Sequence, residues 1–267
     1  MTPYAEVIGD PIGHSKSPLL HRFWLDCLGI PGRYDAVRVS IVGLQDFLHG
    51  RRSDPRWRGC NVTMPLKQAA MALVDDFDET TTRIGALNLI FNDGGRLVGA
   101  NTDWQAIRAL LDRAGVRPER ATIIGTGGAA RAALEEMRRI GVDQVDLVSR
   151  SPDRAFALLA EFGLAGEAIT LGGRPEGDML INASPLGMAG QPKLDLDLSG
   201  MAADATVFDM VYTPAETDLL REARSRGLRT IEGLDMLIGQ AAFAFGHFFG
   251  KVADPVKSSL LRDQLTS

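Results

Sequence analysis

Residues 123–130 read IIGTGGAA and decide the fold of the second half of the chain. They fit the pattern Gly-x-Gly-x-x-Gly/Ala, in which Gly125 makes a tight turn and Gly127 lets a pyrophosphate approach the backbone. The small third residue lets the following helix pack on the strand. An anion at such a turn is stabilised by the free N–H groups and the dipole at the helix N-terminus. An apolar strand over 121–124 and a helix over 129–140 surround the motif, and this context favours a dinucleotide site over a purely structural turn.

The end of the next strand indicates which dinucleotide is bound. A site for NAD places an acidic side chain there to hold the ribose 2′-hydroxyl. This chain instead has Ser-Arg-Ser at 149–151 and Arg154 beyond it, while Asp146 lies inside the strand and Asp153 in the next turn. The guanidinium of Arg150 can bind a 2′-phosphate through two parallel hydrogen bonds, and the neighbouring serines can donate to it. The pattern therefore predicts NADP; the alternative is that Arg150 is a solvated surface side chain.

Composition excludes several classes of protein. The 267 residues include 29 Lys and Arg against 34 Asp and Glu, and the net charge of −5 argues against a general nucleic-acid binder, because such proteins carry a basic face. Two cysteines and four histidines without ligand spacing predict neither a disulfide framework nor a metal site. No run approaches the roughly 18 apolar residues of a membrane span, and the N-terminus does not resemble a signal peptide. A cytoplasmic enzyme with no membrane partner is expected.

Strand and helix signals alternate along nearly the whole chain. Apolar strands separated by helices predict a parallel sheet covered on both faces. A complete set of such units precedes the glycine motif, so we expect two α/β domains with the nucleotide domain second. The expected strands are 4–8, 33–39, 57–62, 86–91, 96–98, 121–124, 145–148, 179–181, 207–210 and 228–231. The Asn-Asp-Gly-Gly sequence at 92–95, between two of these strands, predicts a hairpin turn. The expected helices are 18–28, 42–50, 65–74, 103–114, 129–140, 153–161, 215–226, 234–249 and 255–265.

Two serines near the N-terminus are candidates for binding a small polar ligand. Ser15 and Ser17 are two residues apart, so in an extended segment their hydroxyls point to the same side. Two hydroxyls on one side suit a carboxylate or a polyol. The alternative for Ser17 is that it caps a helix that begins at Pro18.

A lysine and an aspartate in the first half are candidates for acid–base chemistry. If Pro65 opens a helix, Lys67 lies in its first turn, where the helix dipole is unfavourable for a cation. A nearby carboxylate would then be expected to hold it, and the candidate is Asp103. The alternatives are a solvated surface lysine for Lys67 and helix capping for Asp103.

Together and in this order, the motifs resemble the shikimate dehydrogenase family. The resemblance covers nearly the whole chain, and the joint occurrence of the motifs is far more specific than any one of them. The matching segments are 9–18, 61–67, 85–88, 99–103, 125–130 with 149–151, 182–188, 209–212 and 233–240.

The resemblance implies an oxidoreductase that interconverts 3-dehydroshikimate and shikimate with NADP in the biosynthesis of aromatic amino acids. It implies that Lys67 and Asp103 are the catalytic pair. The implied substrate-binding residues are Ser15, Ser17, Thr63, Lys67, Asn88, Asp103, Tyr212 and Gln240. The implied cofactor-binding residues are Gly125, Thr126, Gly127, Gly128, Ala129, Ser149, Arg150, Ser151, Arg154, Met210 and Gly233.

The family's architecture is implied as well. It consists of an N-terminal α/β substrate-binding and catalytic domain, here 1–103 with 234–267, and a Rossmann-type, doubly wound NADP-binding domain, here 104–233. The C-terminal helices return to the first domain. The resemblance allows either a monomer or a homodimer.

Two departures from the family's pattern bear on the substrate. Arg22 replaces the usual Asn and adds charge, and Leu89 replaces the usual Thr and removes a hydroxyl. Quinate or an aminoshikimate therefore stays open as an alternative substrate. A non-catalytic nucleotide-binding protein is a second alternative, and the retention of both Lys67 and Asp103 argues against it. A methyltransferase of similar fold is disfavoured because Arg150 suits a phosphate better than a neutral ribose.

Overall fold

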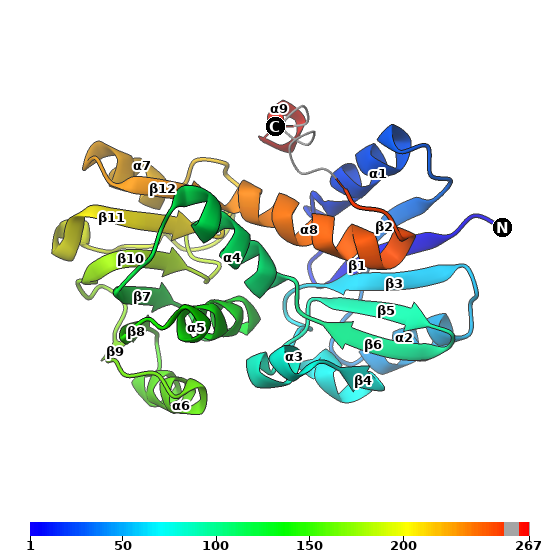
Figure 1. Cartoon of the computed structure of the whole chain (residues 1–267), viewed down its shortest axis with the longest axis horizontal. Helices are drawn as coiled ribbons and strands as arrows, with labels where there is room; N and C mark the ends of the chain where they lie inside the picture. The colour runs from blue at the N-terminus through cyan, green and yellow to red at the C-terminus, as the bar shows by residue number, and fades with distance from the viewer. Residues whose placement is uncertain (254–261, 267) are drawn as a thin grey trace. The chain divides into compact units, whose positions relative to one another are not determined.

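The computed structural model describes residues 1–253 and 262–266. The chain divides into two compact units, each with its own sheet (Figure 1). The first unit holds Met1–Gln105 with Ile238–Leu265, and the second holds Ala106–Leu237. The expected boundaries, after Asp103 and after Gly233, lie close to these divisions. In the part of the chain that the structure describes, no helix is long and apolar enough to cross a bilayer.

The first unit is built on a mixed six-stranded sheet. The strands are β1 (Tyr4–Gly9), β2 (Arg33–Arg38), β3 (Trp57–Val62), β4 (Asp76–Phe77), β5 (Leu89–Asp93) and β6 (Arg96–Ala100). Their order is β2-β1-β3-β5-β6-β4, and β5 runs antiparallel to both of its neighbours. The expected hairpin at Asn-Asp-Gly-Gly (92–95) is confirmed, because β5 and β6 pair antiparallel across it. The parallel arrangement expected from the alternation of strands and helices therefore holds for only part of this sheet.

Both faces of this sheet are covered, as the strand alternation requires. Tyr4 and Ile8 of β1 pack in one core with the helix α2 (Leu44–Arg52), while Ala5 and Val7 pack on the other face with Ala244 and Phe248 of α8 (Gly233–Phe249). Successive residues of a strand point to opposite faces, which explains the division. The remaining helices of this unit are α1 (Ser17–Cys27), the 3₁₀ helix η1 (Ala69–Leu73), α3 (Glu79–Ile84) and α9 (Arg262–Thr266).

The second unit has an all-parallel six-stranded sheet. The strands are β7 (Arg120–Ile124), β8 (Gln144–Val148), β9 (Ala168–Ile169), β10 (Gly177–Asn182), β11 (Met201–Asp209) and β12 (Arg229–Glu232). Their order is β12-β11-β10-β7-β8-β9, in which strands added on both sides of β7 give the doubly wound arrangement of a Rossmann fold. The helices are α4 (Asp103–Ala114), α5 (Gly128–Ile140), α6 (Pro152–Phe162) and α7 (Asp218–Ser225), with the short 3₁₀ helix η2 (Leu198–Gly200). The expected doubly wound fold is confirmed.

One expected helix does not form. Residues 65–74 contain a turn followed by the short η1, because the backbone hydrogen bonds there go elsewhere. The Leu66 amide donates to the carbonyl of Thr63 at 2.9 Å, and the carbonyl of Lys67 accepts from the amide of Leu87 at 3.0 Å instead of from residue 71. A contact with a distant segment thus overrides the local signal of Pro65. Of the helix expected over 255–265, only residues 262–265 fall within the described residues, and these belong to α9.

Two elements of the first unit were not expected from the sequence. They are the short strand β4 and the helix α3, which begins after Asp78. The side chain of Asp78 accepts a hydrogen bond from the amide of Thr81 at 2.6 Å, so a capping signal was present in the sequence. The strand expected over 86–91 begins only at Leu89.

His21 gives this fold a pH-dependent stability. Its ring is fully buried and stacks on Tyr34 with the ring centres 3.8 Å apart, and within the described part of the chain neither nitrogen has a hydrogen-bond partner. Burial lowers the pKa of His21 from 6.5 to about 3, so the folded state resists protonation and the unfolded state does not. Stability contributed by the neutral ring is therefore lost as the pH falls from about 6.5 towards 3.

We expect His21→Phe to remove this dependence, because it keeps an aromatic ring in the core and removes the titrating group. Between pH 7 and pH 5 the free energy of unfolding of the wild type should fall by about 2 kcal/mol more than that of the variant. Urea denaturation at the two pH values measures the difference. Equal losses in the two proteins would contradict the assignment.

Candidate active site

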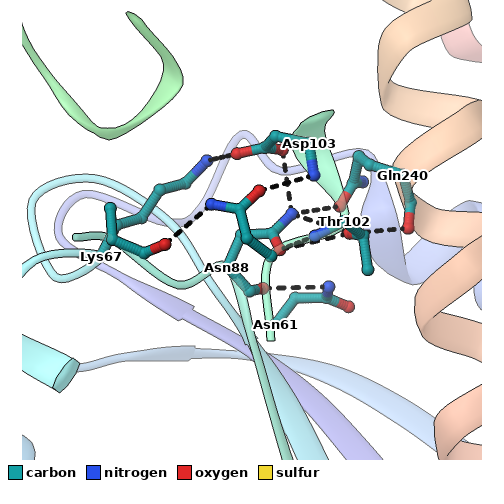
Figure 2. Close-up of polar contacts among 8 residues, drawn as sticks. Asn61, Lys67, Asn88, Thr102, Asp103 and Gln240 are labelled. Carbon is teal, nitrogen blue, oxygen red and sulfur yellow. Dashed lines mark hydrogen bonds and ion pairs between the residues drawn. The ribbon is translucent and has the colours of Figure 1, made fainter. Parts of the chain in front are cut away.

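A short ion pair joins Lys67 and Asp103, which lie 36 positions apart in the sequence (Figure 2). The Lys67 Nζ lies 2.5 Å from Asp103 Oδ2, and the two side chains are only 18% and 6% exposed. Lys67 lies in the turn after β3, and Asp103 is the first residue of α4, where the helix dipole favours a carboxylate. The helix that was expected to present Lys67 is absent, but its expected partner is the one observed. The alternative of a solvated Lys67 is wrong.

Asn88 holds the other side of the Asp103 carboxylate. Its Nδ2 lies 2.9 Å from Asp103 Oδ1 and 2.9 Å from Thr102 Oγ1, and its Oδ1 accepts from the Thr102 amide at 2.7 Å (Figure 2). Asn88 lies immediately before β5 and is 2% exposed. Since both carboxylate oxygens of Asp103 accept side-chain hydrogen bonds, the carboxylate is fixed in one orientation beside the ammonium.

Gln240 of α8 closes the same network. Its Oε1 lies 3.4 Å from Asn88 Nδ2, and its carbonyl oxygen accepts from Thr102 Oγ1 at 3.2 Å (Figure 2). Gln240 is separated from Asn88 by 152 positions, and it is buried. The C-terminal segment therefore supplies part of the site that surrounds Lys67.

Asn61, Asn101 and Thr102 also support the cluster, although none of them was a candidate from the sequence. Asn61 Nδ2 donates to the carbonyl of Asn88 at 3.3 Å, and Tyr34 donates to Asn61 Oδ1 at 2.6 Å. The Asp103 amide donates to Asn101 Oδ1 at 2.9 Å. Thr102 contributes through its contacts with Asn88 and with the carbonyl of Gln240. Asn61, Asn101 and Thr102 lie in the quoted motifs and are buried, so polar residues at core positions were the available signal.

Ser15 and Ser17 lie together at the start of α1, but not in the extended segment that was expected. The Ser15 amide closes a turn on the carbonyl of Ile12, and the Ser17 amide lies 3.4 Å from Ser15 Oγ. Lys16 holds the N-cap position of α1, so the capping alternative for Ser17 is wrong. Neither serine side chain is joined to the Lys67–Asp103 network by a hydrogen bond among residues 1–253 and 262–266.

Thr63 follows β3 and packs closely on β1. A Cβ placed on Gly9 would come within 2.6 Å of Thr63 Cγ2 and 2.9 Å of the carbonyl oxygen of Met64. Gly9 therefore leaves the space in which Thr63 sits, half-buried, beside the turn that carries Lys67.

The glycine motif forms the turn between β7 and α5. Gly125 has φ +108°, and a Cβ there would lie 3.2 Å from the carbonyl oxygen of Ala183, so this position requires glycine. A Cβ on Gly127 would meet nothing within 4 Å, which leaves its backbone open to a ligand. α5 begins at Gly128, and the free N–H groups of its first turn point along the helix axis. The strand order reverses at β7, which has β8 on one side and β10 on the other, and this is where Rossmann folds bind nucleotides.

Two positively charged side chains follow β8, one at its tip and one in the first turn of α6. Arg150 and Arg154 are exposed, and within the described part of the chain neither makes an ion pair. Asp146, the nearest acid in the strand, is fully buried; its carboxylate accepts from Arg120 at 2.9 Å and from the Glu167 amide at 2.8 Å. No carboxylate of β8 is therefore free to hold a ribose hydroxyl. Ser149 accepts a hydrogen bond on its Oγ from the amide of residue 151 at 3.1 Å.

Met210, Tyr212 and Gly233 lie in the second unit, after β11 and at the start of α8. The Met210 amide donates to the carbonyl of Asn182 at 3.0 Å. A Cβ on Gly233 would lie 2.3 Å from the carbonyl oxygen of Val211, so backbone contact alone requires glycine there. Burial raises the pKa of Tyr212, which keeps its hydroxyl protonated and able to donate at neutral pH.

The two departures from the family's pattern lie outside this network. Arg22 donates to Asp35 Oδ1 at 2.6 Å and to the carbonyl of Tyr34 at 3.0 Å. Leu89 is fully buried and packs with Val7 and Phe248 in the apolar core. Each side chain thus has a structural role within the first unit.

No group of three or more His, Cys, Asp or Glu side chains in the described residues could hold a metal ion. The Lys67–Asp103 network presents an ammonium, a carboxylate, side-chain amides and the Thr102 hydroxyl.

Comparison with known proteins gives a consistent result. Residues 7–90 match the shikimate dehydrogenase substrate binding domain. The NADP⁺-dependent shikimate dehydrogenase of Sphingopyxis alaskensis is 51% identical over 251 residues, which cover 93% of this chain and 92% of that protein. The shikimate 5-dehydrogenase of Thermus thermophilus, solved with NADP(H) and shikimate, superposes with a TM-score of 0.88 and 35% identity over 99% of this chain and 100% of that one. Quinate dehydrogenase from Corynebacterium glutamicum, solved with NAD, gives a TM-score of 0.83 and 27% identity, covering 96% of each chain. This chain belongs to the shikimate dehydrogenase family.

Proposed function

We propose that this protein catalyses the reversible, NADP-dependent reduction of 3-dehydroshikimate to shikimate. The observation that carries the proposal is the largely buried ion pair of Lys67 and Asp103, in which Asn88 holds the carboxylate and Gln240 contacts Asn88. Relatives named as NADP⁺-dependent shikimate dehydrogenases at 51% and 42% identity support the substrate and the cofactor. We assign residues 1–103 and 234–267 to the substrate and 104–233 to NADP.

Lys67 and Asp103 have complementary roles in this reaction. When bound, NADPH supplies the hydride that adds to the carbonyl carbon. Negative charge then develops on the carbonyl oxygen, and the Lys67 ammonium stabilises this charge and donates a proton to it. Asp103 orients the ammonium and takes part in the proton path. In the oxidation direction the same lysine accepts the proton of the hydroxyl.

The residues present in the second unit suit NADP. The open backbone at Gly127 and the start of α5 would receive the pyrophosphate. Arg150 and Arg154 would bind the 2′-phosphate, with Ser149 and Ser151 beside it. Met210 and Gly233 would line the nicotinamide end.

The substrate would be held by hydroxyls and amides. Ser15 and Ser17 suit its carboxylate. Its hydroxyl groups would contact Thr63, Asn88, Tyr212 and Gln240.

We also propose a cytoplasmic location, since Cys27 and Cys60 are both free thiols.

A test of all four combinations of shikimate and quinate with NADP and NAD decides the reaction. We expect the purified protein to oxidise shikimate with NADP fastest, as measured by absorbance of the reduced nicotinamide. Turnover of quinate without turnover of shikimate would contradict the proposed substrate. Failure of every combination would favour a nucleotide-binding protein without catalysis.

Lys67→Ala should reduce kcat by roughly 10²- to 10⁴-fold with little change in KM, because the lost ammonium acts on charge that appears during the reaction. Steady-state kinetics with shikimate and NADP provide the measurement. The control is Lys193→Ala, which removes an 87% exposed lysine and should leave both constants unchanged. A change confined to KM would show that Lys67 serves only to bind the substrate.

Arg150→Ala should raise the KM for NADP by roughly 10- to 100-fold and leave the KM for NAD nearly unchanged, because only NADP has the phosphate that the guanidinium would bind. Arg22→Ala is the matched control, since its guanidinium pairs with Asp35 in the first unit. Equal changes for the two cofactors would refute the role of Arg150.

A further inference from the structure

The strands β10 and β11 lie side by side in the second unit (Figure 1), and a cluster of buried polar side chains lies where they end. Asn182 and Asp209 are the last residues of these strands, and they stand opposite each other in the parallel register. Both are fully buried, and Thr217, which precedes α7, is 1% exposed. The mechanism above uses none of these three side chains.

The donors that hold Asp209 in the described structure are neutral. Its Oδ1 accepts from Asn182 Nδ2 at 2.9 Å and from the Val211 amide at 3.0 Å, and its Oδ2 accepts from Thr217 Oγ1 at 2.6 Å. Among the described residues no lysine or arginine pairs with it. Burial raises the pKa of Asp209, while the three hydrogen bonds oppose this by stabilising the carboxylate. A buried carboxylate without a cation is costly, and it persists only when its donors are fixed in direction.

These contacts fix two loops. Asn182 accepts on Oδ1 from Ser184 Oγ at 2.7 Å and donates to the Leu186 carbonyl at 3.1 Å, which shapes the turn after β10. Asp209 fixes the segment after β11 at both ends, through the Val211 amide and Thr217.

The two loops are also joined directly by backbone hydrogen bonds. The Met210 amide donates to the Asn182 carbonyl at 3.0 Å, and the Ala189 amide donates to the Thr213 carbonyl at 2.8 Å. The segment 210–217 therefore has little freedom to move without breaking the bonds to Asp209.

We propose that Asp209 is a positioning residue, whose buried carboxylate holds segment 210–217 so that Met210 and Tyr212 face the nicotinamide and the substrate. This inference rests on the proposed function, which places those two residues at the reacting groups. A displacement of about 1 Å at a reacting group can reduce the rate by about 100-fold, so a fixed backbone here has catalytic value. The carboxylate does not itself touch substrate or cofactor.

The test is Asp209→Asn, which keeps the size of the side chain and replaces one acceptor oxygen with a donor. We expect kcat with shikimate and NADP to fall about tenfold or more, and the KM for shikimate to rise. The dissociation constant of 2′,5′-ADP should stay within about twofold of the wild type, because this probe carries the adenosine and the 2′-phosphate but no nicotinamide. A role in stability alone would lower the unfolding midpoint and leave kcat per folded molecule unchanged.

A second pair of variants keeps the proposal testable if Asp209→Asn does not fold. Thr217→Ser retains the hydroxyl that donates to Asp209, so its kinetics should match those of the wild type. Thr217→Val removes the hydroxyl and should reduce kcat in the same way as Asp209→Asn. Wild-type kinetics in both Asp209→Asn and Thr217→Val, or equal losses in the two Thr217 variants, would overturn the proposal. A wild type that turns over neither substrate would refute the proposed function instead.

Discussion

The side-chain amide of Asn88 is the contact on which the polar cluster of the first unit depends. This amide lies within hydrogen-bonding distance of Asp103, Thr102 and Gln240. The backbone carbonyl of Asn88 accepts a further hydrogen bond from Asn61. A buried amide of this kind must satisfy its donors and acceptors, so each partner is fixed in place. The orientation of the Asp103 carboxylate, and with it the position of the Lys67 ammonium, follows from this one side chain.

The second unit depends on a close backbone approach and on buried side-chain hydrogen bonds. Gly125 lets β7 turn close to the segment after β10, where a Cβ would lie 3.2 Å from the Ala183 carbonyl oxygen, at the point where the strand order reverses. The side-chain hydrogen bond between Asn182 and Asp209 joins the ends of β10 and β11. Fixed loops at the carboxyl ends of parallel strands are how this fold holds a nucleotide, and the exposed arginines that follow β8 suit a phosphate.

Much of this could be predicted from the sequence, and the failures share a cause. The glycine motif gave the parallel sheet of the second unit, and the pairing of Lys67 with Asp103 was expected. The helix over 65–74 was wrong because the Lys67 carbonyl bonds to Leu87, twenty positions away. Leu89 was expected to leave the substrate site without a hydroxyl, but its side chain packs in the apolar core instead. The spacing of residues in the sequence does not indicate which distant segment will form a hydrogen bond with them, or which face of a sheet a side chain will occupy.

The sequence by itself determined the order of strands and helices over most of the chain, the dinucleotide turn and the lack of an acid at the tip of β8. These are properties of neighbouring residues, and periodicity and turn chemistry act over a few positions. Only the tertiary structure decided that Asn61, Asn88 and Gln240 meet around Asp103, and that Asn182, Asp209 and Thr217 form a second cluster. Residues as far as 152 positions apart come into contact only when sheets and helices pack, so their hydrogen bonds depend on the fold as a whole.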